Sequence, residues 1–532
     1  MPMATYASRP AWELRARAAT SAWVAVPLGI GALLAVSVLL RTRELDAGFW
    51  IDEGLSVGIA DRPLDDIPGV LRQDGSPPLY YLLLNVWLAI AGRSEESVHG
   101  LSVLFAALCV PVAFWAGWTL FGRRTAWIAA LLAAVNPFIT QYAQEGRMYA
   151  LLTLLGMIST TCWLQAFTTD AEAPRRAPAI GFAVAFAAML YTHNWALFFG
   201  AASGVAWLVL LWRAGPRATA VTSEARQNRR RLFRTGLIAY GGAVLLYAPW
   251  LPTALYQAAH TGAPWSKSPS LAALASVPAR ILGEVAEVAV FLAAGAGIVA
   301  LLKLRDARSR AVLSLLLIAV LTIVLAWIGS QLSPAWANRY LAAGAAPFLF
   351  LAAAGFAHAG RLGLVGLALV AVLWAIDGAP SEKSNVREVA TSIAPSLRPG
   401  DLVVATQPEQ VSALDYYLPD GVRFATLTGP VRDSGVTDWR DGVERLRATS
   451  AERDLAPLLD SLEPGSRVAL VVPQIYAIGR WSAPWTELVR LRSEEWLRHF
   501  SNDPTLGLTA VEPADPFPSS PNPVRAQVYL KR

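Results

Sequence analysis

Long apolar runs recur through about the first 380 residues, and they constrain the fold more than any other feature of the sequence. In a bilayer, a run of this length satisfies its backbone hydrogen bonds only as a helix or in a closed barrel. The chain of 532 residues is 55% hydrophobic and 16% charged, which is too apolar for an ordinary soluble protein. The sequence therefore predicts a polytopic α-helical membrane protein.

The apolar runs predict about eleven transmembrane helices. The first run follows Arg9, Arg15 and Arg17 and has no evident signal-peptide cleavage site, so we expect this helix to be retained. The run at 78–91 is short for a full span, and we expect it to be half-inserted or juxtamembrane. The predicted spans cover residues 21–40, 98–121, 126–140, 148–167, 180–191, 196–212, 236–256, 285–302, 311–328, 341–357 and 362–376.

Basic residues predict the orientation, because Lys and Arg concentrate in cytoplasmic loops. The arginines of residues 1–20 predict a cytoplasmic N-terminus, and the most basic stretch, at 213–234, then falls on the same side. The loop 41–78 falls on the outer side. If 78–91 crossed the membrane, the later basic loops would lie outside. We expect a multi-pass protein of the plasma (inner) membrane.

The composition changes after the last apolar run. We expect three parts: residues 1–20 as a cytoplasmic N-terminus, residues 21–380 as a transmembrane domain with the external loop 41–78, and residues 385–532 as an extracytoplasmic α/β domain. In this last domain, helical patterns cover 386–397 and 439–462, and buried strands are predicted at 402–405 and 468–472. The net charge of +6 is spread over loops and indicates no nucleic-acid partner.

Ionisable and aromatic side chains converge on the outer ends of the predicted helices. Carboxylates at membrane depth are expensive and usually functional, which makes the adjacent Asp52 and Glu53 the best catalytic candidates. With a carboxylate as base and cations around an anionic leaving group, this face suits proton abstraction from a hydroxyl and departure of a lipid phosphate. The predicted outer-face set is Asp52, Glu53, Glu145, Arg147, Tyr149, His193, Lys267, Arg339 and Tyr340.

The order of several motifs resembles the bacterial dolichyl-phosphate-mannose-protein mannosyltransferase-like family of C-type (GT-C) glycosyltransferases, over roughly residues 20 to 380. This group includes the protein O-mannosyltransferases and the lipid A aminoarabinose transferase. The matching motifs are Asp52-Glu53, Ser76-Pro77-Pro78-Leu79-Tyr80-Tyr81, Phe121-Gly122-Arg123-Arg124, Asn136-Pro137, Gln144-Glu145-x-Arg147-Met148-Tyr149, Tyr191-Thr192-His193 and Asn338-Arg339-Tyr340-Leu341.

The resemblance implies an inverting transfer of a sugar from a polyprenyl-phosphate donor to a cell-wall glycan, lipid or protein acceptor on the outer face. The sugar would be mannose or another hexose or pentose such as arabinofuranose. Asp52 would be the base or acceptor-binding carboxylate and Glu53 its orienting neighbour. Arg339 would contact the phosphate, and Lys267 is a further candidate for this contact. Arg72 and Ser76 stand where the aminoarabinose transferase has a lysine ahead of its proline.

Other interpretations fit parts of the same pattern. A transporter or flippase for a lipid-linked sugar would also gather charges, although nearer the bilayer midplane and in paired halves. A non-catalytic membrane scaffold would leave the motifs unexplained. Within the enzyme interpretation, the donor could also be a lipid diphosphate, because the sequence does not indicate the number of phosphates. Glu145 and Arg147 also fit a structural ion pair, and His193, Tyr149 and Tyr340 also fit an interfacial aromatic belt. A divalent cation beside an aspartate is a possible cofactor, but the sequence has no metal-ligand spacing.

Overall fold

The computed structural model describes residues 11–169, 175–214, 223–376, 383–514 and 520–532, with side chains from residue 25 onward. Arg9 lies outside the described residues. Arg15 and Arg17 belong to the first turns of helix α1, where only the backbone is described. The predicted cytoplasmic segment 1–20 is therefore in part the start of α1.

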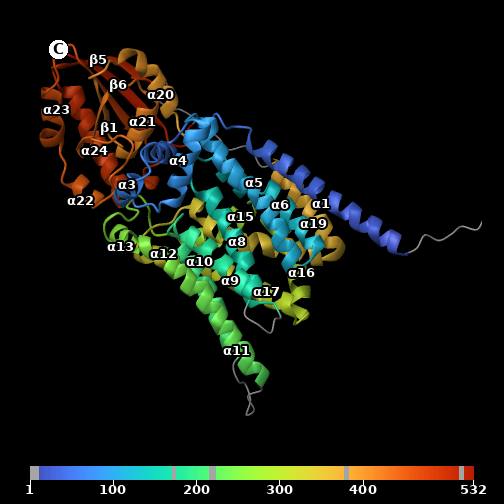
Figure 1. Cartoon of the computed structure of the whole chain (residues 1–532). Coiled ribbons are helices and arrows are strands. Elements are labelled where there is room, and N and C mark those ends of the chain that lie inside the picture. Colours follow the sequence, from blue (N-terminus) through green and yellow to red (C-terminus); the bar gives the residue numbers. More distant parts are fainter. Residues whose placement is uncertain (1–10, 170–174, 215–222, 377–382, 515–519) are drawn as a thin grey trace, which may run out of the picture.

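The first 376 residues form a helical bundle (Figure 1). Its α-helices are α1 (Ala11–Arg41), α2 (Ile51–Ala60), α3 (Ile67–Asp74), α4 (Leu79–Ala91), α5 (Glu95–Leu120), α6 (Arg123–Val135), α7 (Pro137–Ala143), α8 (Tyr149–Phe167), α9 (Arg176–Leu190), α10 (Ala196–Arg213), α11 (Ser223–Gly236), α12 (Gly242–Tyr247), α13 (Leu251–His260), α14 (Leu271–Ala275), α15 (Val277–Leu282), α16 (Glu287–Lys303), α17 (Ala307–Leu332), α18 (Ala345–His358) and α19 (Gly360–Ile376). Shorter π and 3-10 segments are η1 (Leu237–Gly241), η2 (Ala248–Trp250) and η3 (Asn338–Gly344).

Six helices among the described residues are long and apolar enough to cross a membrane, or eight if each of two bent helix pairs is one span. Four shorter apolar helices accompany them, namely Ala25–Arg41, Leu79–Ala91, Arg176–Leu190 and Gly360–Trp374. The chain is thus an integral membrane protein of helical type. The prediction for 78–91 as a short element agrees with α4, which has 13 residues.

One predicted span is not a single helix. The run at 126–140 is divided at Asn136, where α6 and α7 meet at 47°. A residue before proline is disfavoured in the helical conformation, and Asn136 has ψ 127° before Pro137. Its side chain instead accepts a hydrogen bond of 3.0 Å from the Ile139 backbone N–H, which begins α7. This bend places the end of α7 next to the loop 144–148.

Residues from 386 onward build a six-stranded sheet with the order β3-β2-β1-β4-β6-β5. Strands β1 (Leu402–Ala405), β2 (Arg423–Thr426) and β4 (Arg467–Pro473) are parallel, whereas β3 (Gly429–Pro430), β5 (Leu506–Glu512) and β6 (Val524–Lys531) pair antiparallel. Its helical segments are α20 (Val386–Ile393), η4 (Ala394–Ser396), η5 (Pro408–Gln410), α21 (Val411–Tyr417), α22 (Gly442–Arg447), η6 (Ala451–Leu455), α23 (Ala456–Asp460), η7 (Ile478–Arg480) and α24 (Pro484–Asn502).

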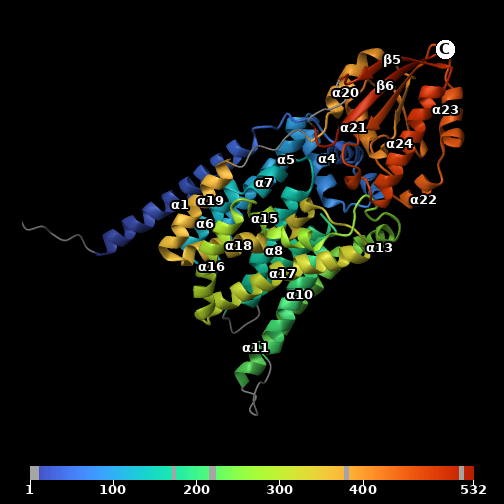
Figure 2. The same cartoon turned by 180° about the vertical axis from the view of Figure 1, so that it is seen from behind.

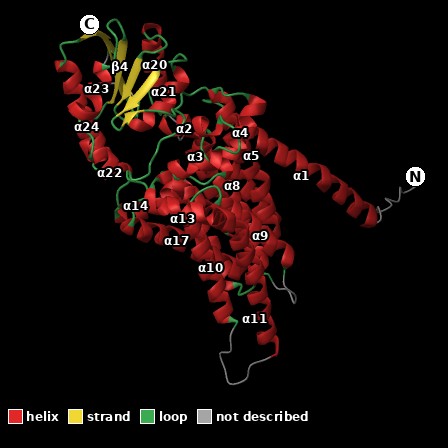
Figure 3. Cartoon of the chain, turned by 60° about the vertical axis from the view of Figure 1, so that its left-hand side comes forward, coloured by secondary structure: helices red, strands yellow, loops and turns green. Residues whose placement is uncertain are grey.

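The predicted strands 402–405 and 468–472 coincide with β1 and β4, the buried centre of this sheet. Successive residues of β1 face opposite cores: Leu402 packs with the α24 side, and Val403 packs with the α20 and α21 side. Helices therefore cover both faces of the sheet (Figure 3), which explains why both strands are apolar throughout.

The helical pattern predicted over 439–462 is present as three short segments rather than one continuous helix. The segment divides into α22, η6 and α23, and Ser450 caps the second piece by accepting from the Arg453 backbone N–H at 3.3 Å. A hydroxyl that can bond to nearby backbone favours such a break over helix continuation.

The α/β domain lies at the end of the bundle that carries α2, α3 and α4, and α11 projects from the opposite end (Figures 1 and 2). The domain touches α2 closely. A Cβ added at Gly54 would lie 2.6 Å from the backbone nitrogen of Ala413 at the start of α21. Glycine at position 54 is therefore what permits this approach, and it fixes α2 between the bundle and the domain.

Candidate active site

Helix α2 presents the two adjacent carboxylates in its first turn. Acidic residues are favourable there because the N-terminal N–H groups carry partial positive charge. The Glu53 carboxylate also accepts a hydrogen bond of 3.3 Å from the Trp50 backbone N–H, which closes the start of the helix. Successive residues point about 100° apart on a helix. As a result the Asp52 side chain is 16% exposed and the Glu53 side chain is 0% exposed.

Asp52 lies between two arginines from distant parts of the chain. Its Oδ2 is 3.3 Å from the Arg339 guanidinium on η3 and 3.9 Å from Nε of Arg147 in the loop before α8. Arg147 also donates to the Asp52 backbone carbonyl at 3.2 Å and to Ser56 Oγ at 3.1 Å. Arg147 thus holds the start of α2, and the two guanidinium groups form a strongly positive surface around one partly exposed carboxylate.

Glu53 has a different environment. Its Oε1 lies 2.6 Å from Lys383 Nζ and 2.8 Å from His99 Nε2, and it accepts from the Gly146 backbone N–H at 2.8 Å. Burial alone would raise the pKa of Glu53, but Lys383 and His99 outweigh burial and lower this pKa to about 2. With both oxygens occupied by protein donors and no exposure, Glu53 cannot touch a substrate here. This environment fits the orienting role that the resemblance implies for Glu53.

Aromatic rings surround the Arg339 guanidinium. Its central carbon is 5.2 to 5.6 Å from the ring centroids of Trp50, Trp265 and Tyr340. His193 stacks 4.4 Å from Tyr340, and the pKa of His193 is lowered to about 3 by burial and by Arg147 and Arg339. His193 is therefore neutral at ordinary pH. Tyr149 completes the cluster, with its ring centroid 6.0 Å from that of His193.

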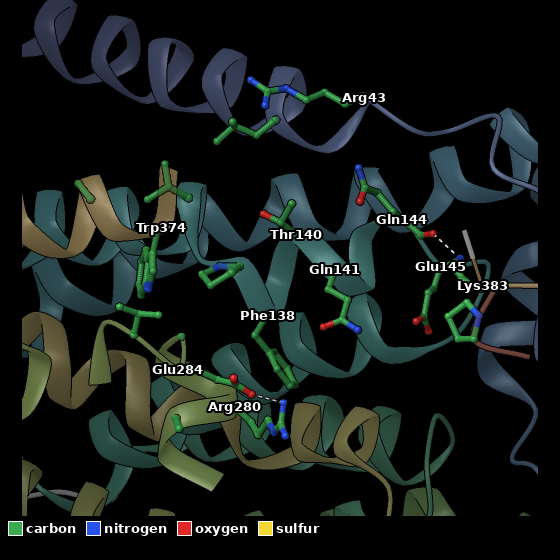
Figure 4. Close-up of a pocket in the computed structure, with 18 of the residues that line it drawn as sticks. Arg43, Phe138, Thr140, Gln141, Gln144, Glu145, Arg280, Glu284, Trp374 and Lys383 are labelled. Carbon is green, nitrogen blue, oxygen red and sulfur yellow. Dashed lines mark hydrogen bonds and ion pairs between the residues drawn. The ribbon is translucent and has the colours of Figure 1, made fainter. Parts of the chain in front are cut away.

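Glu145 closes one side of the cluster and lines a cavity of about 770 Å³ (Figure 4). Its residue is 7% exposed, and its Oε2 has no hydrogen-bond partner. Burial raises the pKa of Glu145 to about 7, against the opposing effect of Lys383. A structural ion pair with Arg147 was one interpretation of these residues; the described side chains show no such pair, because Arg147 is directed to Asp52, Ser56 and Tyr81.

The structure directs Lys267, a predicted site residue, away from Asp52 and toward the α/β domain. Its ammonium donates to the Gly479 carbonyl at 2.7 Å and to Ser482 Oγ, both in the α/β domain. The neighbouring Trp265 rather than Lys267 reaches the cluster. No recognisable motif surrounds Lys267 in the sequence, and a cation in an outer loop serves equally well to attach the domain.

Three residues that contact Glu53 are not predicted as site residues from the sequence, namely His99, Gly146 and Lys383. Lys383 falls between the predicted domains 21–380 and 385–532, in a stretch that looked like a linker. His99 lies one turn into α5 and is fully buried. A signal existed for His99, because an ionisable side chain inside a predicted span is expensive unless it has a partner.

The donor set around Asp52 does not fit a divalent cation. No group of three or more His, Cys, Asp or Glu side chains converges within the part of the chain that the structure describes. Asp52 instead has two guanidinium groups beside it, and hard cations require several oxygen ligands. The arrangement suits an anion such as a phosphate.

Residues 75–222 match the family model described as dolichyl-phosphate-mannose-protein mannosyltransferase, so the resemblance found in the sequence is confirmed. No curated protein matches the chain.

Among solved structures, ArnT from Cupriavidus metallidurans in the apo state has a TM-score of 0.56 and 14% identity, and the match covers 85% of this chain and 93% of ArnT. ArnT bound to undecaprenyl phosphate has a TM-score of 0.56 and 13% identity over 96% of this chain and 98% of ArnT. The archaeal oligosaccharyltransferase AglB from Archaeoglobus fulgidus, in complex with an inhibitory peptide and a dolichol-phosphate, has a TM-score of 0.55 and 11% identity over 91% of this chain and 73% of AglB. The chain shares their fold.

Proposed function

We propose that this chain, a membrane glycosyltransferase of the C-type fold, moves a sugar from a polyprenyl-phosphate donor to a hydroxyl of a cell-envelope acceptor on the outer face of the plasma membrane. The observation that carries the proposal is the Asp52 carboxylate, partly exposed and 3.3 Å from the Arg339 guanidinium. The family match supports the donor class, as do two structures of this fold that hold a lipid phosphate, ArnT with undecaprenyl phosphate and AglB with a dolichol-phosphate.

In the proposed reaction, Asp52 takes the proton of the acceptor hydroxyl. The acceptor oxygen then forms a bond to the anomeric carbon while the bond from that carbon to the phosphate oxygen breaks, with inversion. The polyprenyl phosphate leaves with the electron pair of the broken bond, and Arg339 and Arg147 stabilise its charge. The neutral ring of His193, with Tyr340, offers an apolar surface against which the sugar stacks.

We further propose the orientation expected from the basic loops. The eight spans, together with Ala25–Arg41, Arg176–Leu190 and Gly360–Trp374, would make eleven crossings, with α4 as the juxtamembrane helix. The highly basic α11 and the α/β domain lie at opposite ends of the bundle (Figure 1), so a cytoplasmic α11 puts Asp52 and the domain outside. Mannose is the first donor sugar to test, and arabinofuranose the second.

The test is sugar transfer by the purified protein in detergent, from radiolabelled polyprenyl-phosphate-mannose and then from the arabinofuranose and lipid-diphosphate donors, to a crude cell-wall acceptor fraction. We expect Asp52→Asn to lose about 10² to 10⁴-fold in rate, as the loss of a general base does. Arg339→Ala should reduce the rate as well.

Asp65→Asn is the matched control, because Asp65 is an exposed carboxylate of the same external loop. It should transfer at the wild-type rate. Wild-type activity in folded Asp52→Asn would refute the assignment of the base. Absence of transfer by the wild type with every donor would refute the proposed function.

A further inference from the structure

The cavity beside the catalytic cluster has a polar end and an apolar end (Figure 4). Gln144, Glu145 and Lys383 stand together at one end, and Trp374 of α19 stands at the other. Leu131 and Val135 of α6, one helical turn apart, also line the cavity. A cavity with this division fits a molecule with one polar and one apolar end.

The apolar end is bounded by helices that also face the lipid. Leu40 of α1 and Ala371 of α19 contribute to the lining. The outer surfaces of the same helices carry exposed apolar side chains, such as Leu39 at 68% and Val372 at 56% exposure. These helices lie between the cavity and the lipid-facing surface, so an occupant of the apolar end lies at membrane depth.

The polar end suits hydroxyl groups better than a phosphate. Gln144 and Glu145 stand there beside Lys383, and the carboxamides of Gln141 and Asn522 also line the cavity. Gln144 Oε1 and Glu145 Oε2 are buried without hydrogen-bond partners. A buried oxygen without a hydrogen-bond partner destabilises the fold, and a donor group of a bound molecule would remove this cost.

The cations of the lining support the same conclusion. Lys383 is neutralised by Glu53, and Arg280 pairs with Glu284. Arg43 is exposed above the cavity (Figure 4). The two guanidinium groups beside Asp52 do not line the cavity, so the phosphate-binding chemistry lies on the other side of the site.

Trp50 connects the cavity to the reacting groups. It lines the cavity, and its ring lies 5.5 Å from the Arg339 guanidinium that pairs with Asp52. A headgroup at Glu145 is therefore one aromatic side chain away from the proposed base.

We propose that this cavity is the acceptor site and that the acceptor is a glycolipid: a hydrocarbon chain between α1, α6 and α19, with an uncharged sugar headgroup at Gln144 and Glu145. The inference rests on the proposed function, because it assigns the donor to the opposite, arginine-lined side of Asp52. It narrows the acceptor from a cell-envelope glycan, lipid or protein to a membrane-embedded glycolipid.

The test is photo-crosslinking of the full-length protein in phosphatidylcholine nanodiscs with a dodecyl mannoside that carries a diazirine in its alkyl chain. We expect crosslinks on α6 and α19 that unlabelled dodecyl mannoside displaces. Val135→Trp should reduce their yield at least tenfold by filling the cavity. Val372→Trp is the matched control, because it adds the same ring on the lipid-facing side of α19, and its yield should not change.

A second filling variant, Ala371→Phe, keeps the test valid if Val135→Trp does not fold, and thermal unfolding checks each variant. Displacement by undecaprenyl phosphate at lower concentration than by dodecyl mannoside would make the cavity a donor site and overturn the proposal. Equal displacement by dodecylphosphocholine would make it a general lipid groove and also overturn it. The crosslink does not require turnover. Failure of sugar transfer with a mannoside-specific crosslink would therefore refute the proposed function and leave the glycolipid site.

Discussion

Replacing Lys383 by methionine should both destabilise the protein and reduce its activity, although Lys383 does not touch Asp52. The Lys383 ammonium lies 2.6 Å from Oε1 of the fully buried Glu53 and 2.7 Å from the Gln144 carbonyl. Removal of one partner from a buried ion pair typically costs 3–5 kcal/mol, because an uncompensated charge remains. His99 and two backbone N–H groups still contact Glu53, so we expect a loss of about 3 kcal/mol in the free energy of unfolding.

A pH series gives the sign of this effect. The pKa of Glu53 is lowered from 4.5 to about 2, so the stability that its charge contributes is present above pH 4.5. That contribution is lost as the pH falls from 4.5 toward 2. The difference between wild type and Lys383→Met should therefore be largest at neutral pH and should shrink over this acidic range.

The assay is urea-induced or thermal unfolding of the purified protein in detergent, with sugar transfer measured in parallel. Lys267→Met is the matched control, because it removes an exposed ammonium that also joins the bundle to the α/β domain; its cost should be below about 1 kcal/mol. A double-mutant cycle with Glu53→Gln should show coupling of about 1 kcal/mol or more. Additive effects of the two substitutions would refute the reasoning, as would full activity of Lys383→Met.

Two further predictions concern the neighbours of α2. Glu145 has a pKa raised to about 7, so it is neutral below that pH and negative above it. The KM for an anionic lipid-phosphate donor should therefore rise above pH 7 in the wild type, and this rise should be absent in Glu145→Gln. A Glu145→Gln pH profile identical to that of the wild type would contradict the prediction. Gly54→Ala should cost about 1–3 kcal/mol in unfolding free energy and lower kcat, because its Cβ would overlap the Ala413 backbone. Gly69→Ala, in open space on α3, should not destabilise the protein.

Much of the site could be predicted because the bilayer reduces the choice of folds. Helices must cross, basic loops fix the sides, and the polar ends of helices on one side then meet. On this basis the sequence predicts Asp52, Arg147 and Arg339 on one face from positions far apart in the chain, and the structure brings both guanidinium groups within 4 Å of the Asp52 carboxylate.

The other features of the site depend on the directions of individual side chains, which the hydrophobic periodicity of the sequence does not predict. Asp52 and Glu53 are adjacent and chemically alike, and only the contacts of α2 decide which of them is exposed. Lys383 pairs with a residue 330 positions away, and a stretch between two domains carries no local signal for such a contact. Lys267 shows the converse, because a cation in the correct outer loop bonds to the α/β domain instead.

The geometry of α2 explains why a pair of carboxylates is useful at this place. A short helix of 10 residues has little stability of its own, and its catalytic side chain must nevertheless keep one direction. Because successive side chains diverge by about 100°, Glu53 turns inward whenever Asp52 turns toward the arginines. Glu53 can thus bind α5, the loop 144–148 and the start of the α/β domain without competing for the substrate. The same contact makes the orientation of Asp52 depend on Lys383, which lies just before α20 of the α/β domain.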